Sequence, residues 1–337
     1  MRSSNLLRTA TAAALGLAAA LAPAAASAMH ASTPSPWAAS GSGGGLSWAI
    51  EGSVGAIGGK AYERVYDYPG GDKFKLSQLD WELKNIALVG VEGSVSIAER
   101  FQVNLGYWTA VSEGDGQMVD YDWMLLSADT DDEWTHRSIH PGTSLDSGSV
   151  FDVNLHVKAI DVGPVALSGI VGYLRDEWEW SARGGTYIYS DYENGGFRDQ
   201  EGSFPAGKLA IGYRQTYTTP YLGVACDGDW GAFQLQAFLR YSPWVSAEDS
   251  DLHNLRTPPR TFDGSFSGGT FFGAGLQGTY FFTPSLFVSA ALDVERFSEI
   301  TGDVKIYDGG DYLGTAPDGG SVELGVAAVL LSAGYRF

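Results

Sequence analysis

One stretch decides the fold, Val150-Phe151-Asp152-Val153-Asn154-Leu155-His156-Val157-Lys158-Ala159. Its odd-numbered residues are all apolar, and every even-numbered residue after Val150 is polar or charged. Side chains of a strand alternate between its two faces, so this pattern gives one strand an apolar face and a polar face. The same period of two recurs at 101–105, 233–237 and 286–295. The alternation predicts a sheet with one apolar side and one polar side.

The connections between such stretches alternate in length. Short ones fall near 98–100, 162–164, 227–229 and 283–285. Long ones, rich in Gly and Asp, fall at about 121–148, 182–205, 248–268 and 301–320. A soluble β-sandwich has turns of similar size at both ends. Alternating short and long links are typical of an outer-membrane barrel, with the short turns in the periplasm.

Ten strands are expected between these links, at about 45–67, 75–97, 100–120, 149–161, 165–181, 206–226, 231–247, 269–282, 286–300 and 320–337. The sequence therefore predicts an all-β fold, a ten-stranded antiparallel transmembrane β-barrel with long extracellular loops and short periplasmic turns. An abundance of Gly (45), Tyr (17) and Phe (16) suits strands and turns. A barrel only slightly wider than an eight-stranded one is expected to have no open pore.

The amino-terminal region predicts export. In residues 1–28, Arg2 and Arg8 precede an apolar Ala/Leu run that ends in a small-residue cleavage site, which is typical of a signal peptide. Residues 29–44, rich in Ala, Ser, Pro and Gly, are expected to be a flexible leader before a barrel at 45–337. Cys226 is the one cysteine, so no internal disulfide is expected.

The charge of the chain excludes one class of partner. The formal net charge is −19, and it becomes −21 without the two arginines of the signal peptide. Nucleic acids bind through phosphate contacts to Lys and Arg, so no nucleic acid is expected to bind. An acidic surface favours a basic ligand, such as a basic peptide or protein.

Two acidic stretches carry the chemistry, 118–124 and 248–253. In extended chain, Asp120 and Asp122 share one face, and Asp249, Asp251 and His253 share another. The first stretch ends the third predicted strand and the second follows the seventh, at the long-loop end of both. Strands three and seven lie roughly opposite in a ring of ten, so we expect the two stretches to face each other across the mouth.

This arrangement favours hydrolysis by an activated water. A histidine held by a carboxylate is a candidate general base near neutral pH, so His253 would deprotonate the water while Asp251 orients the ring. Asp120 and Asp122 would hold the water or share a proton. The sequence has no G-x-S-x-G stretch and no His-Glu-x-x-His motif, so neither a serine nucleophile nor a metal is expected. No cofactor is expected.

Several blocks of the chain resemble one family, the omptins, outer-membrane endopeptidases of Gram-negative bacteria. The resemblance runs from about residue 58 to 337. The blocks are Glu63-Arg64-Val65-Tyr66, Ser77-Gln78-Leu79-Asp80-Trp81, Met118-Val119-Asp120-Tyr121-Asp122-Trp123-Met124, His140-Pro141, 182–190, 196–199, 202–205 and Ala210-Ile211-Gly212-Tyr213. By this resemblance, Asp120 and Asp122 match the catalytic aspartate pair, and Asp251 with His253 matches the Asp-His dyad.

The resemblance also implies a substrate. Omptins cut between basic residues, and Glu63 and Asp249 match the family's acids where the basic side chain enters. Two carboxylates suit a guanidinium. The expected activity is therefore that of an aspartyl endopeptidase that cleaves peptides and proteins at basic, preferably dibasic, sites at the extracellular mouth of an outer-membrane barrel.

The chain departs from the family where omptins bind lipopolysaccharide. Tyr173 matches, but Arg175 stands where an acid is usual, and Glu177 and Thr216 stand where arginines are usual. Loss of cations weakens phosphate binding. Outer-membrane lipids are expected partners, and lipopolysaccharide is a candidate activator that this departure calls into question.

One rival interpretation stays open, a catalytically inactive outer-membrane barrel that acts as an adhesin or as a docking surface for basic proteins through its acidic loops. A small-solute channel is a weaker alternative. Cleavage of a dibasic peptide separates the enzyme from the first rival, and conductance in a planar bilayer tests the channel.

Overall fold

The computed structural model describes residues 29–34, 45–124, 133–191 and 194–337. The predicted signal peptide (1–28) and residues 35–44 of the predicted leader lie outside the described residues. The elements are β1 (Leu46–Asp67), η2 (Pro69–Gly71), β2 (Phe74–Ile97), β3 (Phe101–Ala110), β4 (Met118–Asp122), β5 (His136–His140), β6 (Gly142–Val162), β7 (Val165–Arg183), β8 (Thr186–Tyr189), β9 (Gln200–Ser203), β10 (Leu209–Asp229), β11 (Phe233–His253), β12 (Arg260–Phe281), β13 (Leu286–Asp308) and β14 (Asp311–Arg336). In this part of the chain, no helix is long and apolar enough to cross a membrane.

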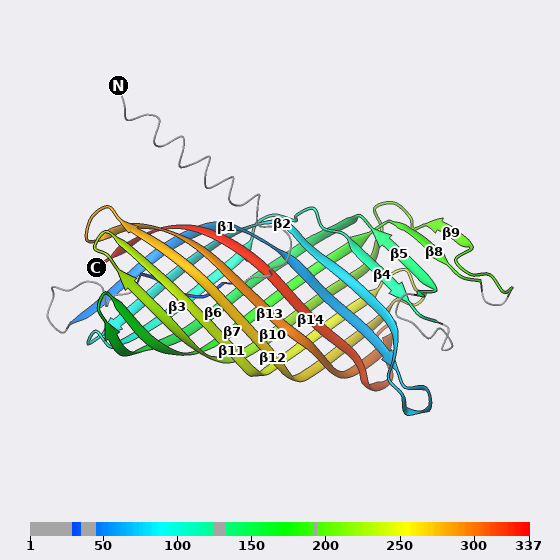
Figure 1. The fold of residues 1–337 in the computed structure, drawn as a ribbon. Coiled ribbons are helices and arrows are strands. Elements are labelled where there is room, and N and C mark those ends of the chain that lie inside the picture. Colours follow the sequence, from blue (N-terminus) through cyan, green and yellow to red (C-terminus); the bar gives the residue numbers. More distant parts are fainter. Residues whose placement is uncertain (1–28, 35–44, 125–132, 192–193) are drawn as a thin grey trace, which may run out of the picture.

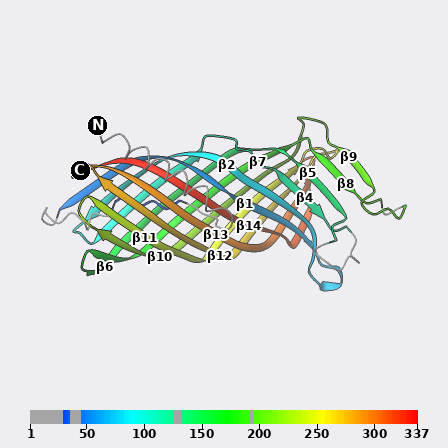
Figure 2. The same ribbon diagram turned by 45° about the horizontal axis from the view of Figure 1, so that its top comes forward.

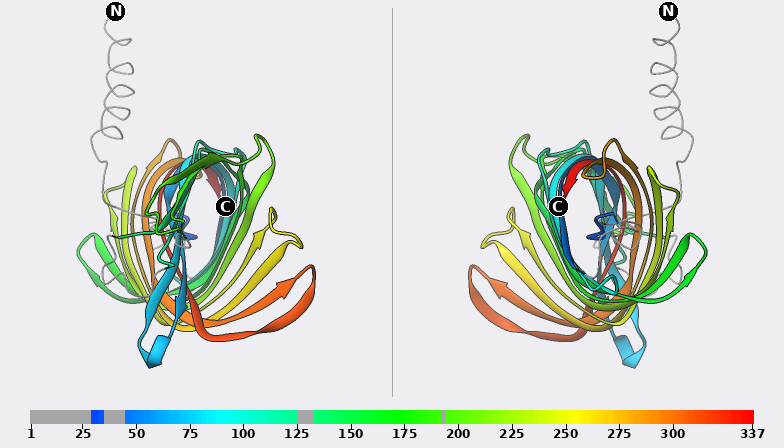
Figure 3. Two further views of the ribbon diagram at one scale, coloured as in Figure 1. Left: turned by 90° about the vertical axis from the view of Figure 1, so that its right-hand side faces the viewer. Right: turned by 90° about the vertical axis from the view of Figure 1, so that its left-hand side faces the viewer.

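Antiparallel pairing closes the sheet into a ring. The pairs run β1-β2-β3-β6-β7-β10-β11-β12-β13-β14 and return from β14 to β1, which makes ten strands in the described residues. Figure 3 looks along this ring from both ends. Closure leaves no exposed edge along the ring. The predicted all-β, antiparallel barrel is confirmed.

The two faces of the sheet follow the alternation in the sequence. On β6, Asp152, Asn154 and His156 are buried inside the ring. Apolar side chains point outward instead, for example Leu222 (52% exposed) and Leu331 (59% exposed). A water-soluble protein rarely exposes such a continuous apolar band, whereas a lipid-facing surface requires one. The residues beyond this band, at the end opposite to the carboxyl terminus, form the outer rim (Figure 1).

Two of the predicted long loops are mostly strand, which corrects the sequence interpretation. β11 continues to His253 and β12 resumes at Arg260, and β13 and β14 are separated by only two residues. The glycines in these stretches do not all make turns. A Cβ at Gly264 would collide with the carboxylate of Asp249, so this glycine gives room to a side chain of the rim.

The third predicted strand, 100–120, is interrupted. β3 ends at Ala110 and β4 begins at Met118, and Gly114 between them has a φ of 70°, in the left-handed region that favours glycine. β4 pairs with β2, and the pairing continues outward through β5, β8 and β9. We call these four strands the flap. Figures 1 and 2 show the flap at the outer rim, beyond the barrel wall.

The predicted flexible leader needs a correction for the part that the structure describes. Residues 29–34 lie inside the ring with all six residues buried. The physical reason is a set of polar partners on the barrel wall, such as Asp152, which receives a hydrogen bond from the backbone N–H of Ala31 at 2.9 Å. The small Ala, Ser and Thr side chains fit a narrow lumen.

Candidate active site

One half of the candidate site is carried by β1, β2 and β4. Asp120 on β4 pairs with Leu79 on β2, and Leu79 pairs on its other side with Glu63 on β1. Directly paired residues face the same side of a sheet, so Asp120 and Glu63 both point to the inside of the ring. The Ser77 hydroxyl donates a hydrogen bond to Asp120 Oδ1 at 3.1 Å. Asp122 pairs with Ser77 and therefore belongs to the same row.

The other half lies on β11. His253 Nε2 is 2.7 Å from Asp251 Oδ2, and the Asp251 side chain is 2% exposed while that of His253 is 20% exposed. An ionised carboxylate can only accept a hydrogen bond, so the ring donates from Nε2 and its Nδ1 keeps a lone pair. Such a ring is fixed in orientation, and its basic nitrogen is available to the mouth of the barrel.

Contacts across the lumen bring the two halves together. Trp81 on β2 stacks on Tyr213 on β10, with ring centroids 5.0 Å apart and an interplanar angle of 13°. Trp81 is two residues from Leu79, and Tyr213 pairs with Asp251. Gln215 Nε2 also donates to the carbonyl oxygen of Tyr62 at 3.0 Å, from β10 to the opposite strand β1. These contacts form a floor below the site and hold its walls face to face.

Charges of one half act on the carboxyl groups of the other half. Burial raises the pKa of Asp120 well above its usual range, and the negative charges of Asp122 and Asp251 raise it further. Burial raises the pKa of Asp122 to about 6, while the Ser77 hydroxyl and the charge of His253 hold it down. Both carboxyls therefore respond to the neighbours that the sequence predicted for them.

Glu63 and Asp249 form an acidic pocket beside these groups. Burial raises the pKa of Glu63 well above its usual range, and Asp251, Asp249 and Asp120 add to the effect. Its Oε2 is buried without a hydrogen-bond partner in the described part of the chain. Asp249 accepts hydrogen bonds from the Tyr213 hydroxyl (3.2 Å) and the Gly264 N–H (2.9 Å). Burial raises the pKa of Asp249 to about 7. Two buried acids with few partners make a strong site for a cation.

Replacing Asp249 by asparagine should stabilise the barrel at high pH. The folded-state pKa of about 7 lies above the ordinary value of 3.8, so the Asp249 carboxyl costs the fold no stability below pH 4. The cost grows between pH 4 and 7, where only the unfolded chain has lost the proton, and is complete above pH 7. At about 1.4 kcal/mol per pH unit, the variant should gain on the order of a few kcal/mol at pH 8 and almost nothing at pH 4. Urea unfolding in lipid at the two pH values measures the gain. A loss of stability at pH 8 would contradict this prediction.

The flap adds residues that sequence reasoning did not single out. Burial raises the pKa of Tyr189 on β8, and the charges of Asp120 and Asp122 raise it further, so this phenol lies near the aspartates. The positive charge of Arg256, in the turn after β11, offsets part of the rise in the pKa of both aspartates. No local motif marks either residue, because their proximity depends on how the flap and the turn fold over the mouth.

His140 has a structural place in the flap. Its Nδ1 contacts the carbonyl oxygen of Gly184 at 2.5 Å, its Nε2 contacts the Ser138 hydroxyl at 2.9 Å, and its ring stacks on Phe204. Both nitrogens have hydrogen-bond partners, so His140 holds the flap in shape. Over the residues with described positions, no group of three or more His, Cys, Asp or Glu side chains is arranged to hold a metal ion.

Comparison with known proteins identifies the family. The profile of the omptin family matches residues 46–337. The plasminogen activator of Yersinia pestis is 31% identical over 293 residues, which cover 86% of this chain and 90% of that protein. Protease 7 of Escherichia coli strain K12 is 34% identical over 258 residues, which cover 76% of this chain and 79% of that protein.

A solved structure supports the same assignment. The crystal structure of the outer membrane protease OmpT from Escherichia coli matches with a TM-score of 0.80 and 29% sequence identity, and the match covers 86% of this chain and 97% of that chain. The fold, the profile and the relatives agree, so the chain belongs to the omptin family and its barrel lies in the outer membrane.

Proposed function

We propose that this outer-membrane protease is an endopeptidase that cuts peptides and proteins at basic, preferably dibasic, sites by means of a water molecule activated by aspartate and histidine. One observation carries the proposal. Asp120 and Asp122 face Asp251 and His253 across the outer mouth, above the Trp81–Tyr213 floor, with an acidic pocket beside them.

In the proposed mechanism, a water between Asp120 and His253 attacks the scissile carbonyl. His253 accepts the proton of the water, and the negative charge of Asp251 stabilises the resulting imidazolium. The tetrahedral intermediate then collapses, the C–N bond breaks, and the proton held by His253 passes to the leaving amine. Asp120 and Asp122 hold the water, one of them protonated because of its raised pKa. No covalent enzyme intermediate is needed.

The acidic pocket supports the basic preference. A guanidinium or ammonium entering between Glu63 and Asp249 would supply a donor for Glu63 Oε2, which has none in the described residues. A bound cation favours the ionised form of both acids and thereby lowers their pKa values. The relatives named as proteases are consistent with this use of the site.

Cleavage of a quenched Arg-Arg peptide by the refolded protein tests the function. We expect a cut between the two arginines, located by mass spectrometry, and little cutting of an Ala-Ala peptide of the same length. An intact Arg-Arg peptide would favour the alternative, an inactive barrel that docks basic proteins through its net charge of −19.

The activity should rise with pH between about 5 and 8. Asp249, with a pKa raised to about 7, is protonated and uncharged at pH 5, so it cannot attract a cation there. Asp122, with a pKa raised to about 6, is also protonated at pH 5, which leaves no ionised carboxylate in the pair that holds the water. The pH profile of kcat/KM for the Arg-Arg peptide measures this rise. In Asp249→Asn, the part of the rise near pH 7 should disappear. A wild-type optimum below pH 5 would refute the role of these acids.

We further propose that lipopolysaccharide is not an obligatory activator. Arg175 and Glu177 form an exposed ion pair at 3.2 Å on β7, so the cation is already neutralised. Thr216, which pairs with Glu177 on β10, offers only a hydroxyl. Two arginines would bind a lipid phosphate far better. Adding lipopolysaccharide to the detergent-refolded protein should change kcat/KM little. Activity that appears only after this addition would contradict the proposal.

A further inference from the structure

Residues 29–34 occupy the inside of the barrel. In both end-on views of Figure 3, this dark-blue stretch lies within the ring. Met29 and Thr33 are 0% exposed and His30 is 3% exposed. The stretch belongs to no strand of the sheet, so the barrel wall holds it through side chains.

Its first half binds to β6 and its neighbours. His30 Nδ1 is 3.0 Å from Asp152 Oδ2, and the Ala31 N–H donates to the same oxygen at 2.9 Å. The Asn154 side chain donates to the carbonyl oxygen of Ala31 at 2.9 Å. The His30 ring also packs against Phe238 on β11, with centroids 4.2 Å apart. Donors and acceptors of the stretch thus meet complementary groups of the wall.

Its second half joins opposite walls. The Ser32 N–H donates to Glu92 Oε2 on β2 at 3.2 Å, and the Ser32 hydroxyl donates to Gln236 on β11. β2 and β11 are five strands apart in the ring of ten, so this one residue bridges the lumen. The Thr33 hydroxyl bonds Ser94 on β2, and Gln102 on β3 donates to the Thr33 hydroxyl at 3.3 Å.

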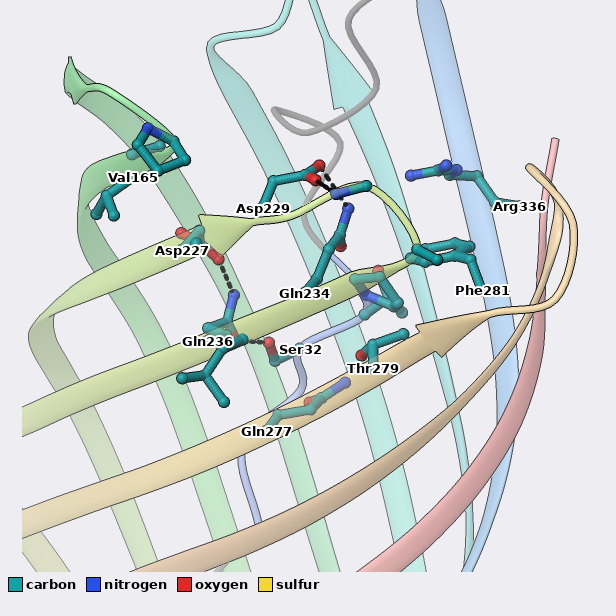
Figure 4. Close-up of a pocket in the computed structure, with 18 of the residues that line it drawn as sticks. Ser32, Val165, Asp227, Asp229, Gln234, Gln236, Gln277, Thr279, Phe281 and Arg336 are labelled. Atoms are coloured by element: carbon teal, nitrogen blue, oxygen red, sulfur yellow. Dashed lines mark hydrogen bonds between the residues drawn. The ribbon is translucent and has the colours of Figure 1, made fainter.

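A pocket opens among the short turns, and its lining includes Ser32, Thr33 and Pro34. This pocket has a volume of about 880 Å³. Figure 4 shows Ser32 at its inner side, with Gln236 between Ser32 and Asp227. The stretch therefore forms part of the wall of this pocket.

The lumen around the stretch is acidic. Glu92, Asp152, Asp176, Asp293 and Glu295 are buried there. Arg240 offsets part of this charge through an ion pair with Glu295 at 2.8 Å. Both carboxylate oxygens of Asp176 have no hydrogen-bond partner in the residues with described positions. An acidic, acceptor-rich lumen selects a ligand that donates hydrogen bonds, as the N–H groups of Ala31 and Ser32 and the hydroxyls of Ser32 and Thr33 do.

We propose that the inner half of the lumen is a peptide-binding site and that its ligand is the chain's own segment 29–34, which staples opposite walls of the barrel. The segment acts at the end of the barrel away from the proteolytic mouth, so this inference does not depend on the proposed cleavage.

A binding measurement tests the site. A refolded variant that lacks residues 29–34 is titrated with a fluorescent peptide, Met-His-Ala-Ser-Thr-Pro, labelled at its carboxyl end. We expect saturable binding to the variant and none to the protein that keeps the segment. A control peptide with Ala in place of both His and Ser should bind at least about tenfold more weakly, because it loses hydrogen bonds to buried acceptors. Absence of binding, or equal binding to both proteins, would overturn the proposal.

A cross-link tests the same site in the protein that keeps its segment. In a Cys226→Ser background, Thr33→Cys and Ser94→Cys should form an intramolecular disulfide under mild oxidation, because the γ oxygens of the two native side chains are in contact. Mass spectrometry after digestion detects the cross-link. Either cysteine alone serves as the control. A chain that cleaves the Arg-Arg peptide but forms no cross-link would refute the staple and leave the protease proposal intact. A cross-linked chain without cleavage would refute only the protease.

Discussion

Replacing His253 by alanine should lower kcat for an Arg-Arg peptide by about 10²- to 10⁴-fold, the usual contribution of a general base, with little change in KM. The ring is the only candidate base held by a carboxylate in the described part of the mouth, through the 2.7 Å contact with Asp251. It does not line the acidic pocket, so substrate binding should survive. Initial rates at several substrate concentrations separate kcat from KM.

A matched control variant distinguishes the loss of the histidine from a folding defect. Asp311 lies exposed at the hairpin between β13 and β14, three strands along the ring from β11, and Asp311→Ala should cleave like the wild type. Heat-modifiable migration in a gel checks that each variant forms its barrel. Normal kcat in a folded His253→Ala variant would remove the histidine from the mechanism.

Truncating either acid of the pocket should remove the preference for arginine. Asp249→Ala or Glu63→Ala is expected to lower kcat/KM for cleavage after arginine by about 30-fold or more, since loss of one partner of a buried charge pair costs about 2 kcal/mol or more. For a peptide with norleucine in place of that arginine, the loss should be much smaller. The ratio of the two kcat/KM values reports the specificity directly.

The outcome for the uncharged peptide decides this prediction. Equal losses for arginine and norleucine would show that the acids support the fold or the chemistry and do not recognise the cation. Glu63→Gln provides a further comparison, because it keeps the shape of the side chain and removes only its charge. It should lose the arginine preference as Glu63→Ala does.

The barrel was predictable from the sequence because lipid and lumen impose opposite demands on neighbouring residues. Asp152 and Val153 illustrate this, since one faces the buried interior and the other the apolar exterior. The outer ends of strands were less predictable. Gly264 belongs to a stretch whose composition is typical of a loop. It nevertheless lies in β12, where the absence of a side chain makes room for Asp249. Composition alone does not distinguish a glycine that turns the chain from one that accommodates a neighbour.

The candidate site was predictable where side chains share one strand. Asp251 and His253 are two residues apart, so their contact follows from the period of a strand. The Trp81–Tyr213 stack joins residues 132 positions apart, and it depends on the closed ring. Residues 29–34 were predicted to be flexible because their hydrogen-bond partners are spread over several strands. No local sequence pattern identifies those partners.

A double-mutant comparison of Asp120→Ala and His253→Ala tests the central claim most directly. If both residues act on the same water molecule, the double variant should cleave the Arg-Arg peptide about as slowly as the slower single variant, because residues that act as a unit have non-additive effects. Losses that multiply in the double variant would show that Asp120 and His253 act independently and would contradict the account.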